Sequence, residues 1–279
     1  TGHDVRPAGD DISSGQTVVP AGSMIGAGEL AMLAAIGMQK VPLRPLPRVA
    51  IVATGDELAV PGQQLQPGQI YDSNSYMLGQ LVREAGAEVS NVDARVADNF
   101  DTVLSSINAG LEACDVLVIC GGVSKGEHDH VKPALKAAGV EQKFWQVALR
   151  PGHPTWFGVK KHQEGKETLV FGLPGNPVSA YVTFQLFVRA AINGLVGADN
   201  APLTLLAEYR GEPQAKKVGF TQALRCKLSN DGEKLVAQPT SNNQRSHALS
   251  SVVAADGLVL LPPESGGVTS GDSVAVQLV

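Results

Sequence analysis

The stretch VLVICGG at residues 116–122 contains the most hydrophobic segment of the chain and ends in two glycines. Five consecutive apolar residues that stop at a glycine are typical of a strand buried on both faces. On both sides of this stretch, other short apolar runs alternate with segments whose apolar residues recur at helical spacing. Alternating strands and helices predict a parallel sheet covered by helices, and therefore an α/β fold.

The same patterns give the expected order of elements around this stretch. We expect strands near residues 49–53, 88–96, 116–120, 144–149, 155–160 and 168–171. We expect helices at residues 73–85, 101–113, 131–138 and 178–195. Residues 47–197 are therefore predicted to form one doubly wound, mostly parallel α/β domain.

The segments before and after this unit have different patterns. Residues 1–46 carry scattered glycines around one apolar helix at 29–36, and prolines between 42 and 47 separate them from the first strand. We expect residues 1–46 to be part of a peripheral N-terminal lobe. In residues 198–279 helical spacing is absent, and short alternating segments are separated by turn sequences such as Asn-Asp-Gly. This pattern predicts a small, all-β, barrel-like domain.

Composition excludes several classes of protein. With a net charge of -5 and no long run of Lys or Arg, the chain lacks the basic surface of a nucleic-acid binder. No apolar stretch reaches the roughly 18 to 20 residues that span a bilayer. The three cysteines share no Cys-x-x-Cys spacing, so neither disulfides nor a zinc site is expected. We therefore expect a cytoplasmic protein that binds neither nucleic acid nor membrane.

Ligands of an open α/β sheet bind beyond the carboxyl ends of its strands, so the residues that follow each strand are the candidates for a site. The first junction places two adjacent carboxylates, Asp56 and Glu57, after the glycine turn at Gly55. Carboxylate oxygens at a strand end could hold Mg²⁺ or position water. A capped turn that feeds a loop is an equally good interpretation of this junction alone.

The second junction follows the most hydrophobic strand and runs through residues 121–129, GGVSKGEHD. Glycines let backbone N–H groups approach an oxyanion closely, Ser124 adds a hydroxyl, and a following helix adds a positive dipole end. This combination predicts a phosphate-binding loop, although it matches neither the dinucleotide nor the P-loop motif. The alternative is a flexible loop whose glycines only permit close packing.

Two more junctions carry prolines together with polar side chains. The third, residues 149–155, places Arg150 and His153 between prolines, where they could bind an anion; a rigid turn with incidental cations is the alternative. The fourth, residues 172–177, is a Gly- and Pro-rich turn between a strand and a long helix. Four such loops at the strand ends of one sheet predict a wide pocket for a polyanion.

Other catalytic classes find little support in the sequence. The histidines share no metal-binding spacing; they are His3, His128, His130, His162 and His247. No Gly-x-Ser-x-Gly motif is present, and Cys120 ends an apolar run, where thiols are usually inert. Hydrolase and cysteine-nucleophile chemistry are therefore not expected.

These loops resemble those of the molybdopterin molybdotransferases, the family of the bacterial MoeA proteins and the gephyrin E domain. The matching motifs are Thr54-Gly55-Asp56-Glu57-Leu58, Gln69-Ile70-Tyr71-Asp72-Ser73-Asn74, Gly121-Gly122-Val123-Ser124 with Asp129, and Gly172-Leu173-Pro174-Gly175-Asn176-Pro177-Val178-Ser179. Two further matches, at residues 6–14 and 249–262, extend the resemblance over essentially the whole chain in order.

The resemblance implies a magnesium-assisted reaction in which adenylylated molybdopterin and molybdate give molybdenum cofactor and AMP. The implied functional carboxylates are Asp56, Glu57, Asp98, Asp129 and Asp11, with Glu57 and Asp129 as the Mg²⁺ ligands. The implied substrate-binding residues are Thr54, Gly55, Asp72, Ser73, Asn74, Gly121, Gly122, Ser124, Arg150, His153, Pro174, Gly175, Asn176 and Pro177. The resemblance also implies a homodimer that works with other molybdenum cofactor synthesis proteins.

Two departures from the family pattern affect these expectations. The family commonly has Lys-Pro-Gly-Lys-Pro where this chain has Arg150 to Pro154, so His153 replaces a lysine. Because an imidazole is only partly protonated near neutral pH, anion affinity or activity is predicted to fall as the pH rises. The chain also begins with Thr1 within the family's pattern, so we expect an N-terminally truncated protein that binds ligand yet turns over poorly.

Two rival functions remain at this point. The related enzyme that adenylylates molybdopterin has the same α/β domain, but the lobe and the β module favour the metal-inserting protein. A non-catalytic pterin-binding scaffold is the other rival. The acidic residues of the first two junctions favour chemistry over a scaffold role.

Overall fold

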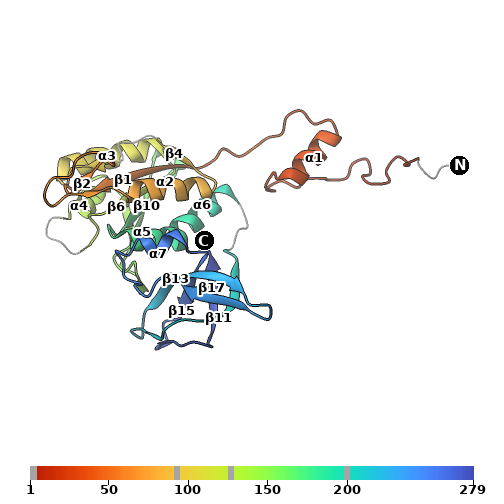
Figure 1. The fold of residues 1–279 in the computed structure, drawn as a ribbon. Coiled ribbons are helices and arrows are strands. Elements are labelled where there is room, and N and C mark those ends of the chain that lie inside the picture. The colour runs from red at the N-terminus through yellow and green to blue at the C-terminus, as the bar shows by residue number, and fades with distance from the viewer. Residues whose placement is uncertain (1–4, 91–94, 125–128, 198–201) are drawn as a thin grey trace.

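The structure is a computed structural model that describes residues 5–90, 95–124, 129–197 and 202–279. A seven-stranded sheet forms the centre of the α/β part of the molecule (Figure 1). Its strands lie in the order β4 (Glu88–Ser90), β1 (Arg48–Thr54), β6 (Val116–Cys120), β10 (Glu167–Leu173), β9 (Trp156–Lys161) and β7 (Glu141–Trp145), with β5 (Arg95–Val96) beside β1.

The sheet is mostly parallel, as predicted. The strands β4, β1, β6 and β10 run in the same direction, and Val116 of β6 lies between Val49 of β1 and Leu169 of β10. On the other side, β9 is antiparallel to both β10 and β7. The expected α/β fold is confirmed, with an antiparallel edge that the sequence pattern did not indicate.

Successive residues of β1 point to opposite sides of the sheet, so the sheet has two apolar faces. Helices cover both of these faces. Val49 and Ile51 pack into a core with helix α2 (Asn74–Glu84) and with the helical segment that begins at α5 (Pro177–Thr183). Ala50 and Val52 pack into a second core with α3 (Phe100–Ala113) and α4 (Val131–Ala137). Two cores, one on each face, are what a doubly wound domain requires.

The long helix predicted at residues 178–195 is present with one irregularity. It runs from α5 through the π-helical segment η2 (Phe184–Val188) into α6 (Arg189–Val196). Gly197, at φ +75°, ends it in the left-handed conformation that glycine adopts without strain.

The second sheet is nearly closed. Its strands lie in the order β14 (Leu235–Pro239), β11 (Thr204–Tyr209), β17 (Ser273–Leu278), β15 (Gly257–Leu261), β13 (Thr221–Asn230) and β8 (Leu149–Arg150), and β14 also pairs with β13. This additional pairing closes five strands into a ring, which agrees with a barrel-like module. Buried Tyr209, Leu224, Val259 and Val276 fill its interior. Short elements complete it: β12 (Gln214–Ala215), β16 (Gly267–Val268) and α7 (Ser250–Val253).

One predicted strand is wrong. Residues 144–149 were expected to form a single strand, but β7 ends at Trp145 and Gln146 has φ +69°. This left-handed residue turns the chain out of the first sheet, and Leu149 then pairs with Thr221 of the barrel. The loop after Arg150 is therefore held by both sheets. The division of the chain at residues 46 and 197 stays a prediction.

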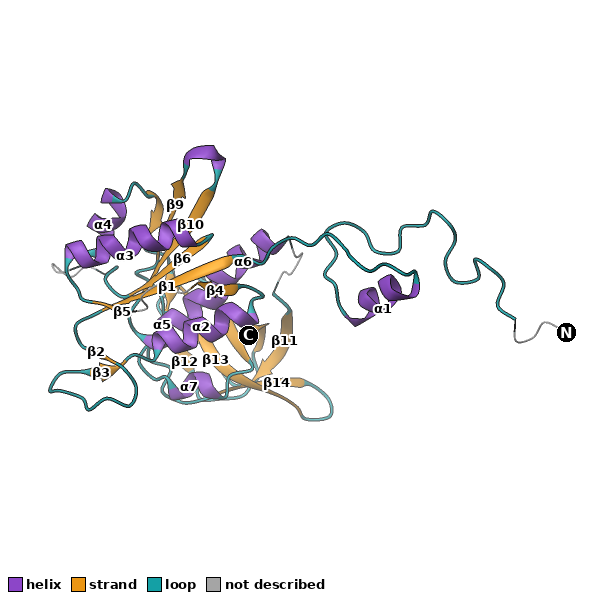
Figure 2. Ribbon diagram, turned by 90° about the horizontal axis from the view of Figure 1, so that it is seen from above, coloured by secondary structure: helices purple, strands orange, loops and turns teal. Residues whose placement is uncertain are grey.

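Residues 5–47 form an arm that leads away from the two sheets (Figures 1 and 2). Its helix α1 (Ala27–Ala35) lies within two residues of the predicted position, and Leu33 is its one buried residue. At the base of the arm, Arg44 donates a hydrogen bond to the carbonyl of Leu195 at the end of α6. Across the described residues, no helix combines the length and apolar character needed to cross a membrane.

Candidate functional site

The loops that follow β1, β6 and β10 meet at one edge of the first sheet. The N–H group of Gly121 donates to the carbonyl of Leu173 at 3.0 Å. A Cβ atom on Gly121 would lie 2.6 Å from the carbonyl oxygen of Thr54, and one on Gly175 would lie 3.7 Å from Gly121 Cα. The approach of Gly121 to Thr54 requires glycine, and Gly175 lies in van der Waals contact with it. The predicted convergence of these three loops is therefore observed.

The remaining loop, the third junction at residues 149–155, reaches the same edge for a different reason from the one expected. It precedes β9, whose first residue Trp156 pairs with Gly172 near the end of β10. Because β9 is antiparallel to β10, its start lies beside the carboxyl end of β10. Thr155 holds the turn through a hydrogen bond from its hydroxyl to the carbonyl of Gly152.

Helix α2 brings a further group of predicted residues to this edge. Asn74 Nδ2 donates to the carbonyl of Gly175 at 2.7 Å and to the sulfur of Cys120 at 3.2 Å. Asp72 is buried and accepts a hydrogen bond from the N–H of Ser75, next to Ser73 at the helix start. Burial raises the pKa of the Cys120 thiol to about 12, which keeps it protonated, as its position in an apolar run predicted.

Three buried polar atoms at the same edge have no hydrogen-bond partner among the described residues. They are Thr54 Oγ1, Asn74 Oδ1 and Ser75 Oγ. Buried polar groups are nearly always satisfied in folded proteins, so these three atoms are candidates to pair with a ligand at this edge. Ser75 was not predicted from the sequence.

Four carboxylates gather beside β1. Asp56 accepts a hydrogen bond from the N–H of Asp98 at 3.0 Å, and the Glu57 carboxylate lies against Gly55. The pKa of Asp98 is raised, first by burial and then by the negative charges of Asp56, Asp129 and Glu57, while His130 acts in the opposite direction. Asp98 Oδ1 and Asp129 Oδ2 are buried without a partner in the described part of the chain.

This arrangement fits a divalent cation bound mostly by water and substrate. In the described residues, no three Asp, Glu, His or Cys side chains are close enough to hold one metal ion together. Mg²⁺ does not need such a cage, because it usually keeps several waters and binds one or two carboxylates plus substrate phosphates. The unpaired oxygens of Asp98 and Asp129 and the repulsion among the four acids are what a cation would relieve.

Asp11 does not join this group in the structure. It lies on the arm, in a hollow formed by arm residues that include Arg6 and Asp10. Residues 125–128 of the second junction, with His128, and also His3 lie outside the described residues. His162 contacts Thr168 Oγ1 at 3.0 Å, and His247 is exposed.

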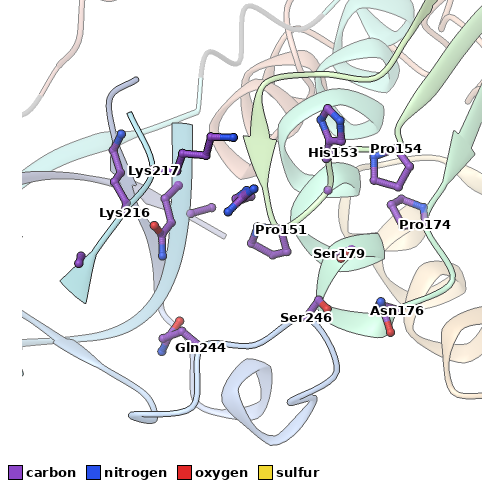
Figure 3. A pocket seen from close by; sticks show the side chains of 15 residues that line it. Pro151, His153, Pro154, Pro174, Asn176, Ser179, Lys216, Lys217, Gln244 and Ser246 are labelled. Carbon is purple, nitrogen blue, oxygen red and sulfur yellow. The ribbon is translucent and has the colours of Figure 1, made fainter. Parts of the chain in front are cut away.

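A cavity of about 480 Å³ lies where the strand-end loops face the barrel (Figure 3). The α/β part contributes four predicted residues to its lining: Arg150, His153, Pro174 and Asn176. The barrel contributes Lys216, Lys217 and Gln244, which lie across the cavity from His153 and Pro174 in Figure 3. Ser246 also lines it, and its carbonyl accepts a hydrogen bond from the N–H of Val178 at the start of α5.

Positive charge is concentrated around Phe220 beside this cavity. The Arg150 guanidinium lies 4.7 Å from the centre of the Phe220 ring, and Lys217 Nζ lies 5.5 Å from it. The His153 ring packs edge-on to Phe220 with 5.5 Å between ring centres. Cationic groups gathered beside one cavity attract an anion, which would offset their mutual repulsion. The cavity therefore has the chemistry of an oxyanion site.

The orientation of His153 has a consequence for binding. Its Nδ1 lies 2.6 Å from the carbonyl oxygen of Val147. A carbonyl only accepts, so Nδ1 carries a hydrogen and Nε2 is the other ring nitrogen. Neutral His153 thus has only a lone pair on Nε2, whereas the protonated ring has a second donor there.

The barrel residues of the cavity were missed by reasoning from sequence. Lys216 and Lys217 are the one adjacent basic pair in residues 198–279, which could have drawn attention to them. Gln244 and Ser246 lie in a polar segment that has no distinguishing pattern. Buried Arg225 was missed too: its backbone N–H donates to Gln244 Oε1, and burial lowers its pKa to about 10.

The crowding of carboxylates gives a testable expectation for Asp98. The pKa of Asp98 is raised, which means that the folded protein holds the carboxyl proton more tightly than the unfolded chain does. The bound proton therefore stabilises the fold at low pH, and this stabilisation is lost as the pH rises through the raised pKa. Asp98→Asn should therefore raise the thermal midpoint at pH 7 without Mg²⁺, and the gain should shrink towards pH 4. Thermal unfolding followed by circular dichroism measures both; an equal gain at the two pH values would contradict this electrostatic account.

Comparisons with known proteins agree with this geometry. Residues 50–194 match the model of a family described as "Probable molybdopterin binding domain", and residues 211–279 match the MoeA C-terminal region (domain IV). Two similar curated proteins of Mycobacterium tuberculosis are molybdopterin molybdenumtransferase 1, 35% identical over 99% of this chain, and molybdopterin molybdenumtransferase 2, 33% identical over 99%. This chain spans 64% and 67% of their respective lengths.

A solved structure gives the same result. The molybdopterin biosynthesis MoeA protein of Pyrococcus horikosii superposes with a TM-score of 0.81 and 32% sequence identity, over 97% of this chain and 64% of that one. The resemblance seen in the loop motifs is thereby confirmed. The chain belongs to the molybdopterin molybdenumtransferase family and carries its molybdopterin-binding and MoeA C-terminal regions.

Proposed function

We propose that this chain carries the catalytic part of a molybdopterin molybdenumtransferase. Adenylylated molybdopterin and molybdate would be the substrates, and molybdenum cofactor and AMP the products. The bond that joins the adenylyl group to the pterin phosphate is hydrolysed, and molybdenum is bound by the dithiolene. The observation that carries the proposal is the meeting of glycine loops, carboxylates and a cation-lined cavity around one sheet edge.

The glycine loop after β6 is suited to the phosphate of the pterin. Gly121 and Gly122 have φ of +97° and +64°. Gly121 packs on Thr54 and Gly122 packs on Val131, and neither has room for a Cβ atom. Asn74 connects this loop to the Pro174–Pro177 turn through the carbonyl of Gly175. A phosphate in this place would be bound by backbone N–H groups and by the unpaired hydroxyl of Thr54.

The cavity next to that loop is suited to molybdate. Arg150 offers paired donors that match an oxyanion, and Lys216 and Lys217 add positive charge from the barrel. Lys216 is held in place by the carbonyls of Phe220 and Pro263, at 2.8 and 3.2 Å. The departure from the family's lysines thus preserves one permanent charge, in Arg150, and makes the other depend on the protonation of His153.

The carboxylates beside β1 are suited to the hydrolytic step. Glu57 and Asp129 would hold Mg²⁺, which would supply positive charge to offset the negative charge of the substrate phosphates. Asp98 and Asp56, joined by a backbone hydrogen bond, lie in the same group and would orient the attacking water. Asp11 lies apart on the arm, so its role would need a second copy of the chain, in keeping with the expected homodimer.

Location and partners follow the same proposal. Three buried, free thiols agree with a reducing cytoplasm. Other molybdenum cofactor synthesis proteins would supply the adenylylated pterin and receive the product. The adenylyltransferase alternative is not favoured, because residues 211–279, most of the barrel, match the MoeA C-terminal region.

The decisive experiment mixes the purified protein with adenylylated molybdopterin, Mg²⁺ and molybdate, and follows AMP release with and without molybdate. Release that depends on both Mg²⁺ and molybdate is expected. A protein that binds adenylylated molybdopterin but never releases AMP would instead be a pterin-binding scaffold.

A second expectation concerns pH. Because only protonated His153 can donate through Nε2, molybdate affinity should fall as the pH rises from 6 to 8. His153→Lys should bind molybdate with nearly the same affinity across this range. Equilibrium dialysis at several pH values measures both proteins, and a flat wild-type profile would remove His153 from the anion site.

A further inference from the structure

Two side chains from outside the glycine loop hold consecutive carbonyls of that loop. Trp145 Nε1, at the end of β7, donates to the carbonyl of Val123 at 3.1 Å. Lys132 Nζ, in the first turn of α4, donates to the carbonyl of Ser124. The two side chains also contact each other, since the Lys132 ammonium lies 4.0 Å from the centre of the Trp145 ring. They form one connected unit, which we call the Lys-Trp pair.

A third contact fixes the loop from the side of the sheet. The side chain of Val123 is buried and packs on Gly172, where a Cβ atom would lie 2.6 Å from Val123 Cγ1. Val123 is thus held by its side chain on β10 and by its carbonyl at Trp145. The backbone at this residue has little freedom to rotate.

The hydrogen bonds to the carbonyls also determine where the loop's N–H groups point. In a trans peptide the C=O and N–H bonds point in opposite directions, so binding the Val123 carbonyl turns the N–H of Ser124 away from Trp145. Gly121 has already used its N–H on Leu173. The N–H groups of Gly122, Val123 and Ser124 donate no hydrogen bond to any described residue. Within the described part of the chain, these are the loop N–H groups left to bind a phosphate.

We propose that Lys132 and Trp145 are positioning residues, which hold the loop carbonyls on one side so that the open N–H groups face the phosphate of the pterin. The inference rests on the proposed function and adds to it the device that orients the phosphate-binding loop. Neither side chain contacts the phosphate in this scheme. Lys132 acts by hydrogen bonding to the backbone, and its ammonium group also makes a cation–π contact with the Trp145 ring.

The test uses single variants that remove one hydrogen bond and preserve the packing. Lys132→Met removes the ammonium and retains the aliphatic stem, and Trp145→Phe removes the indole N–H and retains a ring. Each should weaken binding of molybdopterin, measured anaerobically by equilibrium dialysis, by about tenfold, the loss expected for one hydrogen bond. Lys136→Met, one helical turn further along α4 and exposed, is the matched control and should bind like wild type.

Two further readouts separate positioning from a general loss of stability. The double variant should bind about as weakly as the weaker single variant, because both side chains act through the same loop and their effects are not additive. Lys132→Arg, which retains a cationic donor, should recover most of the affinity. The order of the variants by thermal midpoint should not follow their order by molybdopterin affinity. If Lys132→Met does not fold, Trp145→Phe and Lys132→Arg carry the test.

The outcomes distinguish the two levels of the argument. If both single variants bind molybdopterin with the same affinity as the wild-type protein, the positioning role is overturned and the proposed function is left intact. Independent losses that multiply to about a hundredfold in the double variant would also overturn it, because the pair would not act as a unit. Failure of the wild-type protein to bind molybdopterin would overturn the proposed function together with this inference.

Discussion

Replacing Asp129 by asparagine is expected to lower the rate of AMP release from adenylylated molybdopterin by about a hundredfold or more. Asparagine has nearly the same shape but no negative charge, so it binds a hard cation weakly. The Asp129 carboxylate is half-buried, has an oxygen without a partner in the described structure, and adds to the field that raises the pKa of Asp98. Steady-state AMP release at saturating molybdate measures the effect.

Two controls make this result specific. Asp101→Asn removes an exposed carboxylate from the first turn of α3 and should leave AMP release nearly unchanged. Raising the Mg²⁺ concentration should recover part of the activity of Asp129→Asn if the lost interaction is with the metal. Full activity of Asp129→Asn at low Mg²⁺ would contradict the role of Asp129 and favour a non-catalytic scaffold.

The parts of the fold that could be predicted are those governed by local spacing. The strand at 116–120 and the helices at 73–85 and 101–113 lie within one residue of β6, α2 and α3. The meeting of the first, second and fourth loops follows from the parallel order of β1, β6 and β10, because parallel neighbours end at one edge. The close approach of Gly121 to Thr54 is thus a consequence of a pattern already present in the sequence.

The parts that could not be predicted depend on contacts between distant segments. Nothing in residues 144–149 indicates that Gln146 adopts a left-handed conformation, which glycine or asparagine more often occupies. The pairing of Leu149 with Thr221 joins residues 72 positions apart and brings Lys216 and Lys217 to the Arg150 loop. The anion cavity was therefore half predicted: its cations on the α/β side were identified, and those on the barrel were not.

Gly121→Ala is expected to destabilise the protein by about 2 to 6 kcal/mol. The residue has φ +97°, a conformation that costs an L-residue about 1 to 3 kcal/mol. The new Cβ atom would also lie 2.6 Å from the carbonyl oxygen and 3.0 Å from Oγ1 of Thr54, so the ends of β1 and β6 would have to separate, at about 1 to 3 kcal/mol more. Denaturant unfolding of the two proteins measures the difference.

Gly86→Ala provides the matched control, because Gly86 also has a positive φ, +79°, yet a Cβ atom there would meet nothing within 4 Å. It should cost about 1 to 2 kcal/mol, the backbone contribution alone. The amount by which Gly121→Ala loses more free energy of unfolding than Gly86→Ala then measures the cost of the close approach of the β6 loop to Thr54. Since that approach brings the glycine loop against the end of β1, the same variant should bind molybdopterin poorly even where it remains folded. Equal destabilisation by the two substitutions would show that β1 and β6 are not packed as tightly at this edge as the phosphate-binding loop requires.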